Sequence, residues 1–453
     1  IQEEDPLDVD IAIDPEMLGR VLENLLDENI KKSQGVFYTH RKVVNFMCDY
    51  SLKKFLQNKV SKLFSDSEIN SLIANQEGFE KTEFKKNKLK ELASVIDSEL
   101  EEIKICDPAV GSGAFPVILM KKITNIRVLL SKIMNKEISE YDLKYNFIKN
   151  SLHAVDINAS AIEVTKLRLW LSLIIDIEDF KKVKPLPNLQ YRVIQGDSLI
   201  EKLDNIEIKD SKFLKKNDQL NLATNYSTLD SYFSELTVLQ NKYYNVVSEN
   251  KKKELKVKVS QKLVDIFLEL VKQQNLKKSP NVEEKFRKCV QENIYETFFP
   301  WKLLFANTFK EKNGFDIIIG NPPYLESRDK EFLTSKKDLY IANVEDRFGK
   351  GIVSRGSDLL VYFFPLAIDL INDFGVNCYI TQNSWLNSEY GQKLQNFLNK
   401  TCKKIEIIDS NSRFFSNSKG PNINAVISVI DNFQKKKSTN EKLIYHLIED
   451  RFS

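Results

Sequence analysis

The sequence predicts an α/β protein built on an open, largely parallel β-sheet that helices cover on both faces. From about residue 103 onward, short apolar segments, loops and helical patterns alternate along the chain. Such alternation favours parallel strands joined by helical crossovers. Two charged, helix-prone segments, 57–100 and 203–300, interrupt the alternation. The composition, 42% hydrophobic and 29% charged residues, is typical of a globular chain.

The first 100 residues are expected to form a helical region. The segment DPEMLGRVLENLL (14–26) spaces its apolar residues along one helix face, behind an Asp-Pro start. The aromatic loop GVFYTH (35–40) follows and leads into a second amphipathic helix. We therefore expect this region to precede the sheet and not to belong to it.

The predicted sheet elements follow in order. A strand, a glycine turn and a helix are expected in IKICDPAVGSGAFPVILMKKI, and the pattern repeats in LHAVDINASAIEVTKLRLWLSLIIDI. The other predicted strands are YRVIQGDSL, FDIIIG, VNCYITQNSW, KIEIIDS and NAVISVI, with a helix, DLLVYFFPLAIDLI, after the fourth strand of the chain. The Lys-rich segment 203–300 is nearly free of glycine. It is either a solvated helical excursion or a surface for DNA phosphates.

Charge and composition exclude several functional classes. With 67 Lys and Arg against 64 Asp and Glu, the net charge of +3 is too small to diagnose a nucleic-acid binder. No apolar run approaches the ~18 residues of a membrane span. Five cysteines without a CxxC pair and three widely separated histidines favour a reduced cytoplasmic protein without a metal site or a Ser-His-Asp triad. The start, IQEEDPLDVD, lacks an initiator Met and is expected to be internal to a longer protein.

The glycine turn DPAVGSGAF (107–115) follows a predicted strand and opens a helix. Gly111 and Gly113 allow backbone angles that other residues avoid, and they let a ligand approach the main chain. The turn lacks the third glycine of a dinucleotide fingerprint and the Lys-Ser/Thr of a phosphate loop. An acidic residue here, Asp107, suits a positively charged ligand.

Two further acidic residues follow the next strands. Asp156 ends the second strand, where a carboxylate can accept both hydroxyls of a ribose, and Asp197 ends the third, where it can accept from an adenine amino group. Each alone is more often a helix cap. Three acidic residues at successive carboxyl ends of strands indicate a ligand with a nucleoside and an amine, and S-adenosyl-L-methionine fits that description.

The tetrapeptide Asn-Pro-Pro-Tyr (321–324) follows the strand FDIIIG. The Asn321 side-chain oxygen and the Pro322 carbonyl can both accept hydrogen bonds from one target amino group. The two prolines, Pro322 and Pro323, stiffen the strand exit so that these acceptors are fixed before the substrate arrives. Tyr324 offers a flat face on which an extruded base can stack.

These motifs resemble the amino-group DNA methyltransferases, specifically adenine-N6 enzymes with the gamma order of motifs. Within that group they resemble the methyltransferase part of Eco57I-like Type IIG restriction–modification enzymes. The resemblance extends through residues 14 to 430. It implies a Rossmann-like, S-adenosyl-L-methionine-dependent methyltransferase fold with a mixed sheet, a helical N-terminal region and helical insertions.

The resemblance also implies a division of the chain and a set of site residues. The implied parts are a helical region (1–100), a cofactor-binding half (101–202), the Lys-rich insertion (203–300) and a catalytic half with the base pocket (301–453). GVFYTH resembles the first cofactor motif, with His40 in place of its final proline. The implied cofactor-binding residues are Phe37, Tyr38, Thr39, Asp107, Ala109, Gly111, Gly113, Asp156, Ile157, Asp197 and Ser198. Either Phe414 or Phe415 would supply a second stacking face.

The resemblance implies double-stranded DNA as the partner, and recognition and nuclease domains elsewhere in the parent chain of a bacterial or archaeal restriction system. Two alternatives to an adenine-N6 DNA methyltransferase remain. The acceptor could be a protein glutamine, because protein-glutamine N5 methyltransferases also carry NPPY, or the chain could be a non-catalytic cofactor-sensing subunit. Cytosine-N4 transfer uses a related tetrapeptide that more often starts with Ser.

Overall fold

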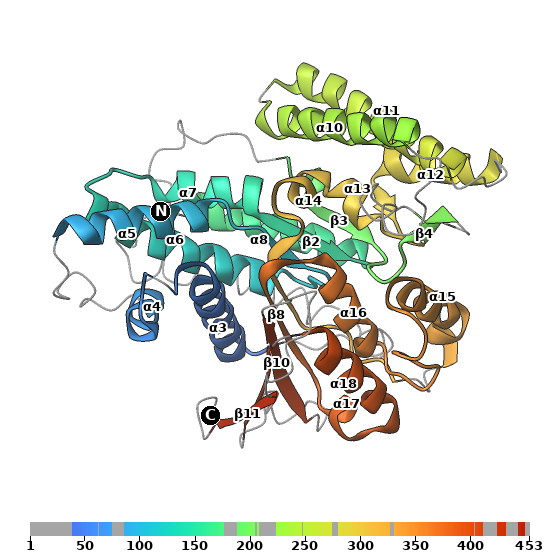
Figure 1. The fold of residues 1–453 in the computed structure, drawn as a ribbon. Helices are drawn as coiled ribbons and strands as arrows, with labels where there is room; N and C mark the ends of the chain where they lie inside the picture. Colours follow the sequence, from blue (N-terminus) through green and yellow to red (C-terminus); the bar gives the residue numbers. More distant parts are fainter. Residues whose placement is uncertain are drawn as a thin grey trace, which may run out of the picture.

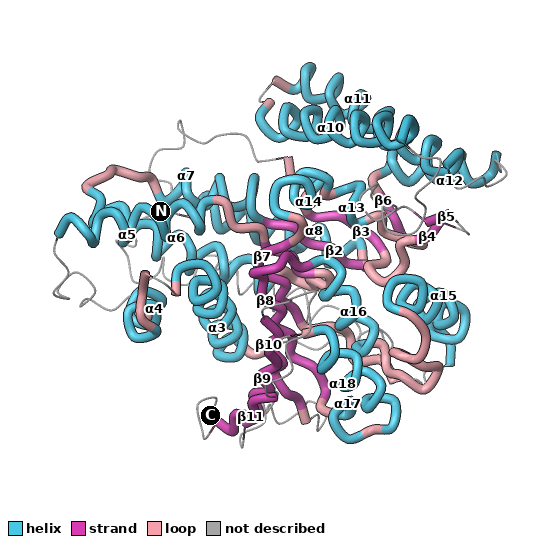
Figure 2. Tube along the Cα trace, viewed as in Figure 1, coloured by secondary structure: helices cyan, strands magenta, loops and turns pink. Residues whose placement is uncertain are grey.

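The computed structural model describes residues 39–61, 63–74, 86–175, 188–203, 206–207, 223–246, 248–273, 280–326, 330–402, 404–410, 424–431 and 443–448. In these residues a nine-stranded mixed sheet forms the centre of the fold, with strand order β11-β9-β10-β8-β7-β1-β2-β3-β6 (Figures 1 and 2). The predicted helix at 14–26 lies outside the described residues.

The sheet is mostly parallel. Six adjacent strands run parallel to one another: β1 (Ile105–Asp107), β2 (Leu152–Asp156), β3 (Val193–Gly196), β6 (Ile294–Tyr295), β7 (Phe315–Gly320) and β8 (Ile371–Gln382). Strand β10 (Ala425–Asp431) is antiparallel to both β8 and β9 (Lys404–Ser410), and β11 (Leu443–Ile448) pairs parallel with β9. A separate hairpin joins β4 (Lys202–Leu203) and β5 (Ile206–Glu207). The predicted α/β class, with its mixed sheet, is confirmed.

Two hydrophobic clusters cover the two faces of the sheet. Along β1, Ile105 belongs to one cluster and Cys106 to the other, as expected when successive side chains of a strand point to opposite faces. The helices packed in the cluster that contains Ile105 are α3 (Arg41–Val60), α4 (Asp66–Ile73), α5 (Lys86–Glu101), α6 (Ala114–Met134) and α8 (Ala159–Ile174). Helix α7 (Glu140–Asn146) and a π-helical turn (Phe147–Ser151) lead into β2.

The helices in the cluster that contains Cys106 come later in the chain. They are α10 (Ala223–Asn245), α11 (Glu249–Gln273), α12 (Pro280–Glu292), α13 (Trp301–Leu304), α14 (Ala306–Lys312), α15 (Lys330–Phe348), α16 (Leu360–Leu370), α17 (Ser384–Asn387) and α18 (Glu389–Thr401). The sequence order thus separates the layers. Helices before β3 cover one face, and helices after it cover the other.

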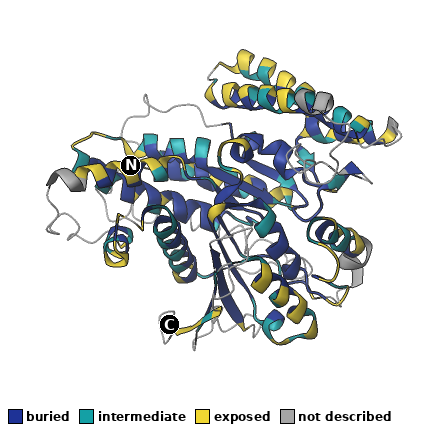
Figure 3. Ribbon diagram, in the orientation of Figure 1, coloured by how far each residue is buried: buried dark blue, intermediate teal, exposed yellow. Residues whose placement is uncertain are grey.

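The Lys-rich insertion is helical, as predicted, but it is not simply a solvated excursion. Phe267 of α11 stacks on Phe286 of α12, with ring centroids 4.1 Å apart, and both side chains are buried. Gln240 of α10 donates a 3.0 Å hydrogen bond to the Leu304 carbonyl. Figure 3 shows that α10 and α11 keep exposed outer faces. One side of the insertion therefore belongs to the core beside the β3–β6 edge.

The structure reveals short strands that the sequence patterns did not indicate. These are β4, β5 and β6, which have two residues each, and β11. A strand of two residues carries too little periodicity to be distinguished from a loop.

No described helix is long and apolar enough to span a membrane.

Candidate active site

The glycine turn between β1 and α6 has the predicted backbone. Gly111 and Gly113 both have positive φ, at 53° and 80°. A Cβ at Gly111 would meet none of the described atoms within 4 Å, so the main chain there borders open space. A Cβ at Gly113 would lie 2.9 Å from Oγ1 of Thr165. Gly111 therefore leaves room beside the loop, and Gly113 allows the loop to pack on α8.

Helix α8 holds this turn in place. Thr165 Oγ1 donates a 2.9 Å hydrogen bond to the Gly111 carbonyl. The buried Arg168 guanidinium donates to the Ser112 carbonyl at 2.7 Å and to its hydroxyl at 3.1 Å. Neither Thr165 nor Arg168 was predicted from the sequence. Their spacing of three places them on one helix face, but nothing in the sequence shows that the face meets the glycine turn.

Asp107, at the end of β1, is buried and only partly satisfied. Its Oδ1 accepts a 3.1 Å hydrogen bond from the Ala109 N–H, whereas its buried Oδ2 has no hydrogen-bond partner among the described residues. Burial raises the pKa of this carboxyl well above its usual range, the Ala109 hydrogen bond lowers it, and nearby Asp156 raises it further. A buried carboxylate oxygen without a partner suits a cationic ligand such as an ammonium group.

Asp156 lies at the end of β2, as predicted, and its carboxylate contacts two loops. Oδ2 accepts a 2.8 Å hydrogen bond from the Gly111 N–H, and Oδ1 accepts one of 2.9 Å from Asn158. Partial burial raises the pKa of Asp156, and these backbone donors oppose the rise. The next residue, Ile157, is 39% exposed. Asp156 thus fixes the glycine turn and retains lone pairs for further donors.

Asp197 and Ser198 follow β3 and are both buried. The Ser198 hydroxyl donates a 2.6 Å hydrogen bond to the Pro108 carbonyl and so ties this loop to the glycine turn. Asp197 Oδ2 accepts from Lys336 Nζ at 2.9 Å and from the Tyr340 hydroxyl at 3.1 Å. Sequence reasoning missed both of these partners on α15.

The tetrapeptide lies against the glycine turn and Thr39. A Cβ at Gly320, the residue before it, would lie 2.7 Å from Asp107 Oδ1. The Asn321 side-chain nitrogen donates a 3.0 Å hydrogen bond to Thr39 Oγ1, across 282 residues of sequence. Because this bond uses the amide nitrogen, it orients the carboxamide and directs its oxygen away from Thr39. Asn321, Asp107 and Thr39 therefore form one site.

The rest of the tetrapeptide is held by packing. Pro322 is buried and Pro323 is partly exposed. The Tyr324 hydroxyl donates to the Ile380 carbonyl of β8 at 3.2 Å, and only 8% of the residue is exposed. Burial raises the Tyr324 pKa well above its ordinary value, so the phenol stays protonated and can donate this bond. The ring is anchored at its polar end.

His40, which stands where the family motif has proline, keeps the geometry of that position. Its φ of −58° is close to the value that a proline ring imposes. Its ring nitrogen accepts a hydrogen bond from the Lys42 N–H and caps α3. Thr39 is buried beside it. The predicted residues Phe37, Tyr38, Phe414 and Phe415 lie outside the described residues.

Comparisons with known proteins identify the family of the chain. The family model described as Eco57I restriction-modification methylase matches residues 150–415, and the MmeI DNA-methyltransferase domain matches residues 79–200. The Methanocaldococcus jannaschii protein RM.MjaORFECS2P, named as a type II restriction enzyme and methyltransferase, is 29% identical over 381 residues. That match covers 73% of this chain and 32% of the relative.

The matches to a second relative and to a solved structure cover smaller shares of those proteins' own lengths. DNA methyltransferase A of Bacillus subtilis is 24% identical over 160 residues, which is 35% of this chain and 16% of that protein. The DrdV–DNA complex aligns with 96% of this chain and 30% of its own, at 14% identity and a TM-score of 0.48. This chain spans about a third of the M. jannaschii relative. The chain belongs to the Eco57I restriction-modification methylase family.

Proposed function

We propose that the chain is the methyltransferase part of a restriction–modification protein and acts on the N6 amino group of adenine in double-stranded DNA. The contact between the tetrapeptide and the cofactor motifs supports this proposal above all others. Asn321 is hydrogen-bonded to Thr39, and Gly320 packs on Asp107. A base acceptor and a cation acceptor thus lie next to each other, as a group transfer between two bound molecules requires.

S-adenosyl-L-methionine is the cofactor that the family implies and that these residues fit. When bound, it would supply the methyl group: its sulfur–methyl bond would break as the amino nitrogen takes the methyl, S-adenosylhomocysteine would leave, and the nitrogen would release a proton to water. Asp107 would hold its ammonium group through Oδ2, Asp156 its ribose hydroxyls and Asp197 its adenine amino group. The open space beside Gly111 leaves room for it along the main chain.

Asn321 and Pro322 would hold the target amino group. Two fixed acceptors take its two hydrogens and draw the lone pair out of conjugation with the ring, which makes the nitrogen nucleophilic. The Thr39 hydrogen bond keeps the Asn321 carboxamide oriented before the base arrives. Because a base inside a duplex cannot reach such a site, the adenine must be extruded, and Tyr324 is the proposed stacking partner. We place this activity in the cytoplasm of a bacterium or archaeon.

The test uses the full-length protein, duplex DNA and cofactor with a labelled methyl group, followed by mass spectrometry of digested DNA and of protein. We expect N6-methyladenine from the wild type. We expect turnover to fall by roughly 100- to 1000-fold in Asn321→Ala, because the acceptor for the target amino group is lost. Sinefungin affinity should stay within about threefold of wild type, because the variant keeps Asp107, Asp156 and Asp197 and loses only the Thr39 hydrogen bond on the cofactor side. Asn399→Ala, at an exposed position on α18, is the matched control. Label in cytosine or in a protein glutamine, or wild-type turnover by Asn321→Ala, would overturn the proposal.

A further inference from the structure

Helix α15 begins six residues after the tetrapeptide and contacts the loop that carries Asp197. Four of its residues, spaced along one face, make these contacts: Lys336, Tyr340, Asn343 and Arg347. Spacings of four, three and four place them in one stripe along the helix. The stripe faces residues 197–201, just beyond β3.

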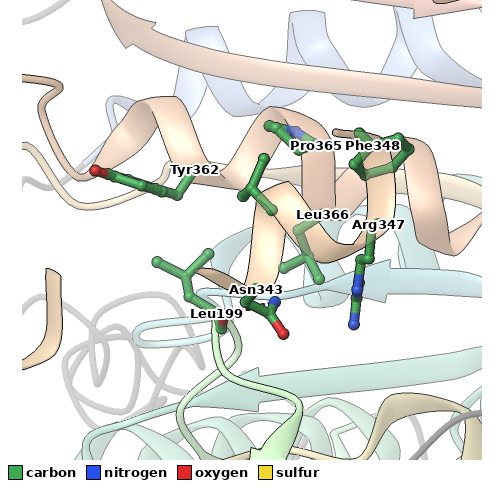
Figure 4. A pocket seen from close by; sticks show the side chains of 8 residues that line it. Leu199, Asn343, Arg347, Phe348, Tyr362, Pro365 and Leu366 are labelled. Atoms are coloured by element: carbon green, nitrogen blue, oxygen red, sulfur yellow. Dashed lines mark hydrogen bonds between the residues drawn. The ribbon is translucent and has the colours of Figure 1, made fainter. Parts of the chain in front are cut away.

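The far half of the stripe fixes the helix to the loop. Asn343 donates a 2.9 Å hydrogen bond to the Leu199 carbonyl and accepts one of 3.3 Å from the Glu201 N–H. Arg347 pairs with Glu201 and, at 2.8 Å, with Asp369 of α16. Figure 4 shows Asn343 beside Leu199, in a small pocket that α16 residues also line. The helix is therefore docked on this loop independently of Lys336 and Tyr340.

The near half of the stripe acts on Asp197 itself. Lys336 and Tyr340 both donate to Oδ2, and the Leu199 N–H donates to Oδ1 at 3.2 Å. Two donors fill the two lone pairs of Oδ2, whereas the single backbone bond leaves Oδ1 with one. The Asp197 side chain is 4% exposed and pairs with the Lys336 ammonium at 2.9 Å, so the pair is largely shielded from water.

We propose that Lys336 and Tyr340 are positioning residues that make the cofactor site selective for a 6-amino purine. They hold the Asp197 carboxylate turned so that Oδ1 accepts from the exocyclic amino group. This inference rests on the proposed function, in which Asp197 binds the adenine of the cofactor. Without Lys336, Oδ2 loses its charged donor and the carboxylate can rotate, so that Oδ1 is no longer fixed toward the amino group. Lys336 and Tyr340 therefore determine whether the site prefers a 6-amino or a 6-oxo purine.

The test compares the dissociation constants of S-adenosylhomocysteine and S-inosylhomocysteine, measured by calorimetry on the full-length protein. We expect wild type to prefer the 6-amino ligand by roughly 10- to 100-fold, the range for a hydrogen bond to a charged group. We expect this preference to fall to about threefold or less in Lys336→Met and to an intermediate value in Tyr340→Phe. Lys336→Arg should restore most of it, because the charge is kept.

The control is Lys350→Met, at an exposed lysine just beyond α15. A purely structural role would weaken both ligands equally and leave their ratio unchanged. A ratio within twofold of wild type in both Lys336→Met and Tyr340→Phe would therefore overturn the inference while leaving the proposed function intact. If wild type binds neither ligand, the proposed function fails and the inference fails with it.

Discussion

Gly320, the residue before the tetrapeptide, packs closely on Asp107 of the glycine turn. Its backbone does not need positive φ, so replacing it tests steric fit alone. A Cβ there would lie 2.7 Å from Asp107 Oδ1, and the carboxylate is buried and cannot move freely. We expect Gly320→Ala to weaken sinefungin binding and turnover by about tenfold or more, since overpacking a tight contact costs about 1–3 kcal/mol.

Calorimetry and a methylation assay check this expectation. The control is Gly356→Ala, where the nearest atom to the added Cβ is Ser354 Oγ at 3.8 Å, an ordinary contact. Equal affinities of the two glycine variants for sinefungin would show that the tetrapeptide and the glycine turn are not in close contact at Gly320.

Asp107 illustrates a conflict between stability and binding at a single residue. Its folded pKa is raised by burial above the ordinary value of 3.8, so its ionised form destabilises the ligand-free fold as the pH rises through that pKa. We expect Asp107→Asn to raise the melting temperature of the ligand-free protein at pH 7, and to abolish the increase that sinefungin causes in wild type. Because protonation of Asp107 removes its buried charge, lower pH should also stabilise ligand-free wild type and weaken its affinity for the cationic ligand. Thermal scans with and without sinefungin test both, and an undiminished ligand shift in the variant would contradict the assignment.

At the scale of residues, the sequence located the acidic groups because parallel strands place their carboxyl ends at one edge of a sheet. Asp107, Asp156 and Asp197 each end or follow a strand, and NPPY follows another. What the sequence could not reveal is which side chains hold these residues. Lys336 and Asp197 lie 139 positions apart, and their contact depends on how α15 docks.

At the scale of elements, the strands of the sheet other than β6 and β11 were predictable because each is a short apolar segment next to a turn. The segment KIEIIDS, for example, coincides with β9. The role of the insertion was not predictable from charge alone. Lys242, Lys251 and Lys253 are exposed, whereas the aromatic side chains of Phe267 and Phe286 on α11 and α12 join the core. Helical amphipathicity shows that a face is buried but not what it is buried against.

We therefore expect the insertion to be required for stability. Phe267→Ala should lower the free energy of unfolding by about 3–5 kcal/mol, because it removes a fully buried ring stacked on Phe286. Val257→Ala, on the same helix but 68% exposed, should change it by less than about 0.5 kcal/mol. Urea denaturation of both variants makes the comparison. Similar losses, or none, would mean that the insertion folds apart from the sheet.

At the scale of the whole molecule, α3 joins the site to the far half of the sheet. Thr39 lies just before this helix and contacts Asn321. Farther along α3, Lys54 pairs with Glu406 of β9 at 2.5 Å, and Tyr50 also donates to Glu406. The site therefore depends on a helix from the N-terminal region that is held by a strand more than 300 residues away.

The Glu406 cluster makes that attachment sensitive to acid. Burial raises the pKa of Glu406, but hydrogen bonds from Lys404, Lys54 and Tyr50 outweigh it and bring the pKa to about 2, below the ordinary value of 4.5. A lowered folded pKa stabilises the protein above pH 4.5, and this contribution disappears as the pH falls from 4.5 towards 2.

We expect Glu406→Gln to cost about 3 kcal/mol of unfolding free energy at pH 7, because it leaves the buried Lys54 without its 2.5 Å partner. The difference from wild type should shrink between pH 4.5 and pH 2 as wild type loses the same charge. Glu254→Gln, in an exposed pair with Lys258 on α11, is the control and should leave the free energy of unfolding nearly unchanged. Denaturant titrations at several pH values measure all three proteins. A pH-independent difference would mean that the charge of Glu406 does not hold α3 to the sheet, and that packing alone brings Thr39 to Asn321.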